Sequence, residues 1–60
     1  MLEDYPELLT RRQAQEILHM GKNRILDHIQ SGRLRAMILD GRYLIKKEDL
    51  VDFINRLPYR

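Results

Sequence analysis

Residues 35–47 read Arg-Ala-Met-Ile-Leu-Asp-Gly-Arg-Tyr-Leu-Ile-Lys-Lys, the most informative segment of the sequence. Two runs rich in β-prone side chains, residues 35–39 and 42–46, flank the dipeptide Asp40-Gly41. An Asp-Gly pair between such runs is one of the strongest signals for a two-residue β-turn, because both turn positions require a positive φ. The stretch therefore predicts a short antiparallel β-hairpin.

A two-residue turn also sets which residues meet across the hairpin. The expected cross-strand pairs are Leu39 with Arg42, Ile38 with Tyr43, and Ala36 with Ile45. Side chains alternate between the two sides of a strand. The first face of the hairpin then carries Ala36, Ile38, Tyr43 and Ile45, and its second face carries Met37, Leu39 and Leu44.

Two short amphipathic helices are predicted before the hairpin. The first covers residues 11–19 and opens with Thr10-Arg11-Arg12-Gln13, which has the form of a capping box. After a break at Met20-Gly21, the second covers residues 22–31 and stops at Gly32, a residue type that readily adopts the left-handed conformation. Two short helices joined by a brief turn with a glycine are typical of a helix-turn-helix.

A third helix is predicted after the hairpin, over residues 47–57, and Pro58 ends it. The order of helix, helix, two-stranded β-hairpin wing and helix predicts an α+β fold, mostly α, of the winged helix-turn-helix class. We expect an N-terminal tail over residues 1–9, the winged domain over residues 10–57 and a C-terminal tail over residues 58–60.

Charge is distributed unevenly along the 60 residues, whose net charge is +2. Residues 10–47 carry nine basic and three acidic side chains, a local net charge of +6. Residues 1–9 have a net charge of −3, and residues 48–60 have one of −1. A basic centre between acidic ends is expected of a surface that binds nucleic acid, although a solvated basic face would look the same.

The composition argues against several classes of function. Without cysteine there is no disulfide, no thiolate chemistry and no finger-type zinc site. His19 and His28 lack the i, i+4 spacing of a helical pair of metal ligands. Ser31 is the only serine, no Gly-rich phosphate loop is present, and the chain is too short for a large pocket. We therefore expect no enzyme, no cofactor, no metal and no small-molecule ligand.

Hydropathy also bears on where the protein acts. The longest aliphatic run, residues 36–39, is far shorter than the ~20 residues that cross a bilayer. Residues 1–4 lack the basic and apolar regions of a signal peptide. We expect a cytoplasmic protein without membrane contact.

The pattern as a whole is similar to one known family. The residues that carry the similarity are Leu9-Thr10, Ala14, Ile17-Leu18, Met20-Gly21-Lys22, residues 25–29, Ser31-Gly32-Arg33-Leu34 and residues 43–50. In these residues the chain resembles the excisionase-type branch of the MerR-like winged helix-turn-helix domains. The resemblance implies a second helix in the major groove of double-stranded DNA and a wing against the backbone or minor groove. It also implies a bacterial or mobile-element protein that acts in excisive recombination, with a tyrosine-type integrase as partner, or in transcriptional control.

Two departures from the family pattern stand out. Gly21 occupies the position where the family often has Ser before the second helix, so a hydroxyl contact to phosphate is lost there. The wing is short and apolar on its second face, which argues against deep insertion into the minor groove and favours contact with protein.

Candidate DNA contacts follow from the predicted second helix. The residues expected opposite its apolar stripe are Asn23, Arg24, Asp27, His28 and Ser31. Arg24 is the best candidate to read a base, because its guanidinium fork matches O6 and N7 of guanine, and Asn23 could read adenine in the same way. Asp27 could accept from cytosine N4. Lys22 lies in the first turn, where a phosphate is readily bound. Ordinary solvated helix residues would show the same pattern.

Basic residues outside that helix complete the predicted interface. Arg11 and Arg12 open the first helix beside its positive dipole end, an unfavourable place for cations that phosphate contact would explain. Arg42 follows the hairpin turn and is expected to touch the DNA backbone. General electrostatic attraction is expected from Arg33, Arg35, Lys46 and Lys47.

These features predict a sequence-specific double-stranded DNA-binding protein, in its most specific form an excisionase-like accessory factor. A small transcriptional regulator is the alternative of the same class. A protein-interaction module that uses the apolar wing face is the alternative from a different class. Because the sequence has no long coiled-coil helix, we expect a monomer that binds neighbouring DNA sites cooperatively through the second face of its wing.

Overall fold

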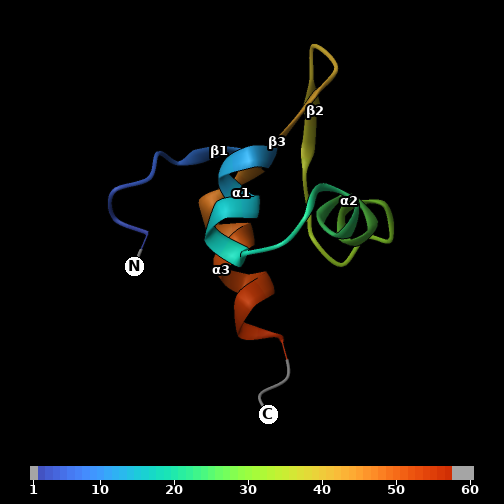
Figure 1. Ribbon diagram of the computed structural model, residues 1–60. Coiled ribbons are helices and arrows are strands. Elements are labelled where there is room, and N and C mark those ends of the chain that lie inside the picture. Colours follow the sequence, from blue (N-terminus) through green and yellow to red (C-terminus); the bar gives the residue numbers. More distant parts are fainter. Residues whose placement is uncertain (1, 58–60) are drawn as a thin grey trace.

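The computed structural model describes residues 2–57 and shows three helices around a small sheet (Figure 1). The elements in chain order are β1 (Leu8–Thr10), α1 (Arg11–Leu18), α2 (Lys22–Gln30), β2 (Met37–Leu39), β3 (Arg42–Lys46) and α3 (Lys47–Asn55). The predicted winged helix-turn-helix class is confirmed by this order, with one strand more than expected. The predicted C-terminal tail, residues 58–60, lies outside the described residues.

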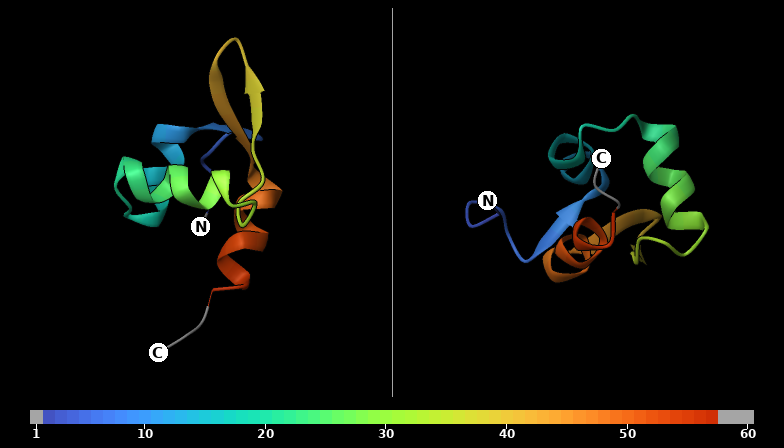
Figure 2. Two further views of the ribbon diagram at one scale, coloured as in Figure 1. Left: turned by 90° about the vertical axis from the view of Figure 1, so that its right-hand side faces the viewer. Right: turned by 90° about the horizontal axis from the view of Figure 1, so that it is seen from below.

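The wing is a hairpin of β2 and β3 that rises above the helices (Figure 2). Its cross-strand pairs are Met37 with Leu44, Ile38 with Tyr43, and Leu39 with Arg42. Two of the three predicted pairs are confirmed, whereas Ala36 precedes β2 and does not pair with Ile45. The turn residues Asp40 and Gly41 have φ values of 51° and 75°. Positive φ at both central positions matches the right-handed twist of the flanking strands, so the Asp-Gly dipeptide sets the hairpin.

Strand β2 begins two residues later than predicted, at Met37 instead of Arg35. The cause lies just before it. Leu34 is almost fully buried, and its backbone N–H donates to the carbonyl oxygen of His28 at 3.1 Å. This anchor holds the chain against the end of α2, so that pairing with β3 starts only further along.

A third strand, β1, lies within the segment predicted as an N-terminal tail. It pairs antiparallel with β3, in the register Leu8 with Lys46, Leu9 with Ile45, and Thr10 with Leu44. The side chains of Leu9 and Ile45 are both fully buried. β3 is therefore the central strand of a sheet with the order β1-β3-β2.

Lys47 ties the N-terminal segment to the start of α3. Its backbone N–H donates to the carbonyl oxygen of Glu7 at 2.8 Å. Its ammonium group donates to the carbonyl oxygens of Leu2 and Tyr5, at 3.3 and 3.1 Å. The Lys47 Nζ atom also lies 3.8 Å from the Glu7 carboxylate. These contacts direct the side chain inward, so Lys47 stabilises the fold and adds less to the basic surface than predicted.

The core lies between the sheet and the three helices. Its buried side chains are Leu2, Leu9, Ala14, Ile25, Leu34, Ile45, Leu50 and Phe53. All elements except β2 contribute to this set. The first helix begins with the predicted capping box, in which the Gln13 N–H donates to Thr10 Oγ1 at 3.1 Å and the Thr10 N–H donates to Gln13 Oε1 at 3.0 Å.

The helix ends agree closely with the local signals. α1 stops at Leu18, and His19 takes the left-handed cap position with a φ of 55°. α2 stops at Gln30, followed by Gly32 with a φ of 84°. α3 ends at Asn55, two residues earlier than predicted.

We predict that Leu9→Ala destabilises the domain by about 2–5 kcal/mol, because it leaves a cavity beside Ile45 in the core. A domain of this size has little stability in reserve, so the variant should unfold at a much lower urea concentration. Leu8→Ala is the matched control, since Leu8 is the neighbouring residue of β1 and is 46% exposed. Equal midpoints for the two variants in urea titrations followed by circular dichroism would mean that β1 adds nothing to the core.

Candidate nucleic-acid interface

Helix α2 has one buried and one exposed side. Ile25 is fully buried against the core, and Leu26 and Ile29 pack partly against it. The exposed residues of the first two turns are Lys22, Asn23, Arg24 and Asp27. The structure thus brings four of the five α2 residues predicted as DNA contacts onto the solvent-facing side of one helix.

The start of α2 favours an anion. Gly21 is the N-cap in an extended conformation, with φ −74° and ψ 168°, and it has no side chain with which to cap the helix. The backbone N–H groups of the first turn therefore face solvent together with the exposed ammonium of Lys22. Such a helix end, with its positive dipole, suits a phosphate oxygen.

Asp27 is already engaged within the molecule. Its carboxylate accepts a hydrogen bond from the Arg33 guanidinium at 2.8 Å, and both side chains are more than half exposed. An exposed ion pair of this kind is worth only ~0–1 kcal/mol, so Asp27 can exchange Arg33 for another donor at little cost. A contact from Asp27 to a base would compete with this pair.

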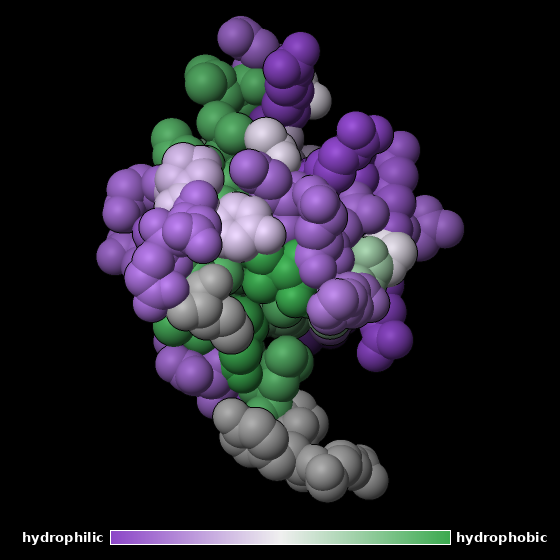
Figure 3. Space-filling model, turned by 60° about the vertical axis from the view of Figure 1, so that its left-hand side comes forward, coloured by the Kyte–Doolittle hydropathy of each residue, from purple (hydrophilic) through white to green (hydrophobic). Residues whose placement is uncertain are grey.

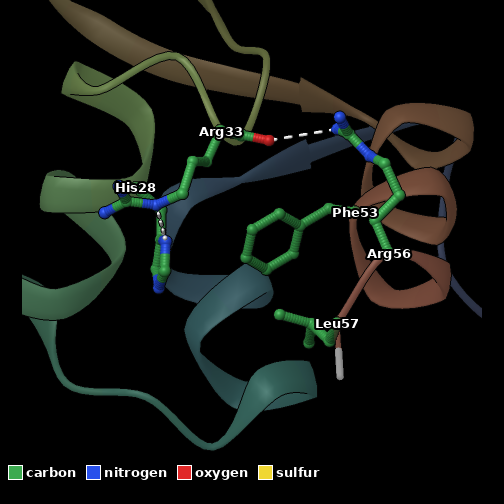
Figure 4. Close-up of a pocket in the computed structure, with 5 residues that line it drawn as sticks. All are labelled: His28, Arg33, Phe53, Arg56 and Leu57. Carbon is green, nitrogen blue, oxygen red and sulfur yellow. Dashed lines mark hydrogen bonds between the residues drawn. The ribbon is translucent and has the colours of Figure 1, made fainter. Parts of the chain in front are cut away.

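His28 points away from the exposed group on α2. Its ring packs edge-to-face against Phe53 of α3, with centroids 5.0 Å apart and planes at 67°. Its Nδ1 atom accepts a hydrogen bond from Arg33 Nε at 2.9 Å (Figure 4). His28 follows Ile25 by three residues, a spacing that places it beside the buried stripe of the helix. The structure therefore separates His28 from Arg24.

A cleft of about 240 Å³ lies between α2 and α3 next to these contacts. It is lined by His28, Arg33, Phe53, Arg56 and Leu57 (Figure 4). The Arg56 guanidinium donates to the Arg33 carbonyl oxygen at 3.2 Å and pairs with Asp52 at 3.2 Å. The polar groups around the cleft thus bind one another, and they join the end of α2 to α3. The sequence pattern did not reveal this network, because its partners lie on different elements.

The basic residues outside α2 divide into two kinds. The Arg11 side chain is half-buried and donates to the side chain of Gln15 along α1, whereas Arg12 is exposed. Arg42 is exposed beside the turn of the wing, opposite Leu39. Of the predicted backbone contacts, Arg12 and Arg42 are therefore the more accessible.

Metal-binding clusters and membrane-spanning helices are absent from the described part of the chain. Residues 2–57 contain no group of three or more His, Asp or Glu side chains that could hold a metal ion. No helix in the same range is long and apolar enough to cross a membrane.

Comparison with known proteins identifies one family. A family model described as a helix-turn-helix domain matches residues 8–58, from the start of β1 to just beyond the described end of the chain. No curated protein and no solved structure matches. The match covers both helices of the turn, the wing and α3.

We predict that Arg24→Ala weakens binding to a specific duplex by about 1–3 kcal/mol and leaves binding to random duplex nearly unchanged, because a guanidinium fork discriminates between bases. Both affinities are measured at one salt concentration on a site selected from a random library. Gln30→Ala, an exposed change at the other end of α2, should affect neither affinity. If Arg24→Ala weakens binding to both duplexes equally, Arg24 contacts a phosphate and does not read a base.

We predict that Arg42→Ala weakens binding to every duplex and lowers the slope of log K against log salt by about one, the share of a single phosphate contact. Lys46→Ala removes the same charge from the base of the same strand, where Lys46 pairs with Leu8. This control should change the slope less. An unchanged slope and affinity for Arg42→Ala would mean that the wing tip makes no contact with the backbone.

Proposed function

We propose that this chain, which belongs to the helix-turn-helix domain family, is an excisionase-like accessory protein for site-specific recombination of a mobile element. Membership of the family implies sequence-specific binding of DNA. The observation that carries the proposal is the exposed group of Lys22, Asn23 and Arg24 on α2, in a molecule that also presents Arg42 on its wing.

The dimensions of the molecule suit a duplex. An α-helix with its side chains is about 10–12 Å across, and the major groove of B-DNA is about 12 Å wide, so a helix such as α2 can enter it. With α2 in the groove, Arg24 and Asn23 face base edges and Lys22 faces a phosphate. Arg12 and Arg42 would then meet the backbone, and phosphate contacts of this kind position a protein without reading sequence.

The proposed role requires no catalysis by the chain itself. Proteins of this family are typically not enzymes, and an accessory factor acts by occupying and bending its sites. The strand exchange belongs to a partner, for which we propose a tyrosine-type integrase. Both would act on DNA in the cytoplasm of a bacterial host.

Two alternatives make different predictions. A small transcriptional regulator would use the same DNA-binding surface without an integrase. A protein-interaction module is favoured by the apolar wing, where Met37 is 40% exposed and Leu39 is 59% exposed. That module would bind DNA weakly and without sequence preference.

The test of DNA recognition is selection from a random duplex library, followed by titrations in increasing salt. We expect one enriched site, bound about 10³-fold or more tightly than random duplex, with affinity that falls steeply as salt rises. Failure to enrich any sequence would favour the protein-interaction module. Recombination assays with integrases encoded near such sites, with and without this protein, then separate an excision factor from a regulator.

A further inference from the structure

Strand β2 is the most exposed apolar element of the described chain. Met37, Ile38 and Leu39 are 40%, 69% and 59% exposed, and no residue of β2 is buried. The space-filling view shows apolar side chains gathered on the wing at the top of the molecule (Figure 3). Three consecutive large apolar residues exposed on so small a hairpin indicate a binding partner, because without one they promote aggregation.

The backbone of β2 is also open on one side. In the sheet order β1-β3-β2, this strand pairs with β3 alone among the described strands. The pair Leu39–Arg42 closes the two-residue turn, so the hydrogen-bonding groups of Leu39 face β3. Those of Ile38 then face outward, because successive residues alternate in direction. Natural edge strands are commonly protected by lysine, proline or a bulge, and Met37–Leu39 has none of these.

We propose that β2 pairs antiparallel with β2 of a second copy of this chain, about a two-fold axis through Ile38. Ile38 then lies opposite Ile38 of the second copy, and Met37 lies opposite Leu39. The two sheets join edge to edge. This proposal deepens the proposed function, because cooperative binding to neighbouring DNA sites needs a contact between copies.

Charge favours this register. Strand β2 ends at Leu39, and the turn residue Asp40 that follows it comes level with Ala36 of the second copy, next to Arg35. The two-fold axis repeats this approach of opposite charges at the other end of the paired segment. No charged residue lies between them, since residues 36–39 are all apolar. A second copy therefore complements both the apolar centre and the charged ends of the strand.

The faces of the two sheets also continue into each other. Met37 and Leu39 share the face of the sheet that carries Leu8 and Leu44, and Leu8 is 46% exposed. Joining two copies therefore extends one apolar face across the axis.

The contact between copies is small. A contact of three residues per chain buries much less than the ~1,200–2,000 Å² of a stable interface, so association without DNA should be weak. Two copies on adjacent DNA sites have a high effective concentration for each other, so the same contact then stabilises the bound pair.

Symmetry adds a consequence for the DNA. A two-fold axis between copies requires half-sites in inverted orientation, because the symmetry of the duplex site mirrors that of the protein pair. Direct repeats would require a head-to-tail contact, which this pairing does not supply.

Engineered cysteines test the register, and the natural chain has no cysteine to interfere. In a non-hydrogen-bonded antiparallel pair, such as Met37 with Leu39 of the second copy, the Cα atoms lie about 4.5 Å apart, within the range that a disulfide spans. Two Leu39 residues are diagonal neighbours about 7–8 Å apart, beyond that range. A mixture of Met37→Cys and Leu39→Cys should therefore yield the mixed disulfide dimer roughly tenfold faster than either variant alone. Val51→Cys, at a 39% exposed position on α3, measures random collision.

The oxidation is run without DNA and on duplexes that carry two selected sites in inverted or direct orientation. We expect the mixed dimer to form faster on the inverted duplex than on the direct one. Mixed dimers no faster than the single variants or Val51→Cys would overturn the pairing, as would faster reaction on direct repeats. Affinity for a single site, measured on the reduced variants, tests DNA binding separately: if it is retained while cross-linking fails, only the pairing is wrong.

Discussion

The register in which β3 pairs with β1 determines where the other elements lie. Ile45 must lie opposite Leu9 for both side chains to be buried. A slip by one residue would expose Ile45 and turn Lys46 toward the core. The resulting loss of folding free energy would unfold so small a domain. Because α3 follows β3 directly and the wing turn precedes it, this one register sets both the position of α3 and the direction of the wing.

The orientation of α2 determines which of its residues form the candidate interface. Ile25 fixes the rotation of α2 about its own axis by packing into the core, which leaves Arg24 on the exposed side. The hydrogen bond from Arg33 to His28 and the contact of His28 with Phe53 then hold the end of α2 against α3. A helix held at both its buried face and its end can place side chains with the accuracy that base reading needs.

Sequence predicts those features whose signals are local, and it misses those whose partners are distant. The Asp40-Gly41 turn and the Thr10 capping box are complete within a few residues, and both are present as predicted. β1 is too short to show a periodic pattern, and its partner β3 lies far along the chain, so the sequence alone predicts a tail at residues 8 and 9. His28 is predicted to lie with Arg24, although its i+3 spacing from Ile25 already sets it beside the buried stripe; its partner Phe53, on a distant element, has no local signal.

We propose that α2 and the wing together form the DNA-binding surface. Amide chemical shifts of isotope-labelled protein, followed during titration with a short selected duplex, test this proposal residue by residue. We expect the largest changes at residues 22–27 and around Arg42, with small changes at the end of α3. Changes centred on the cleft between α2 and α3, with residues 22–27 unaffected, would contradict it.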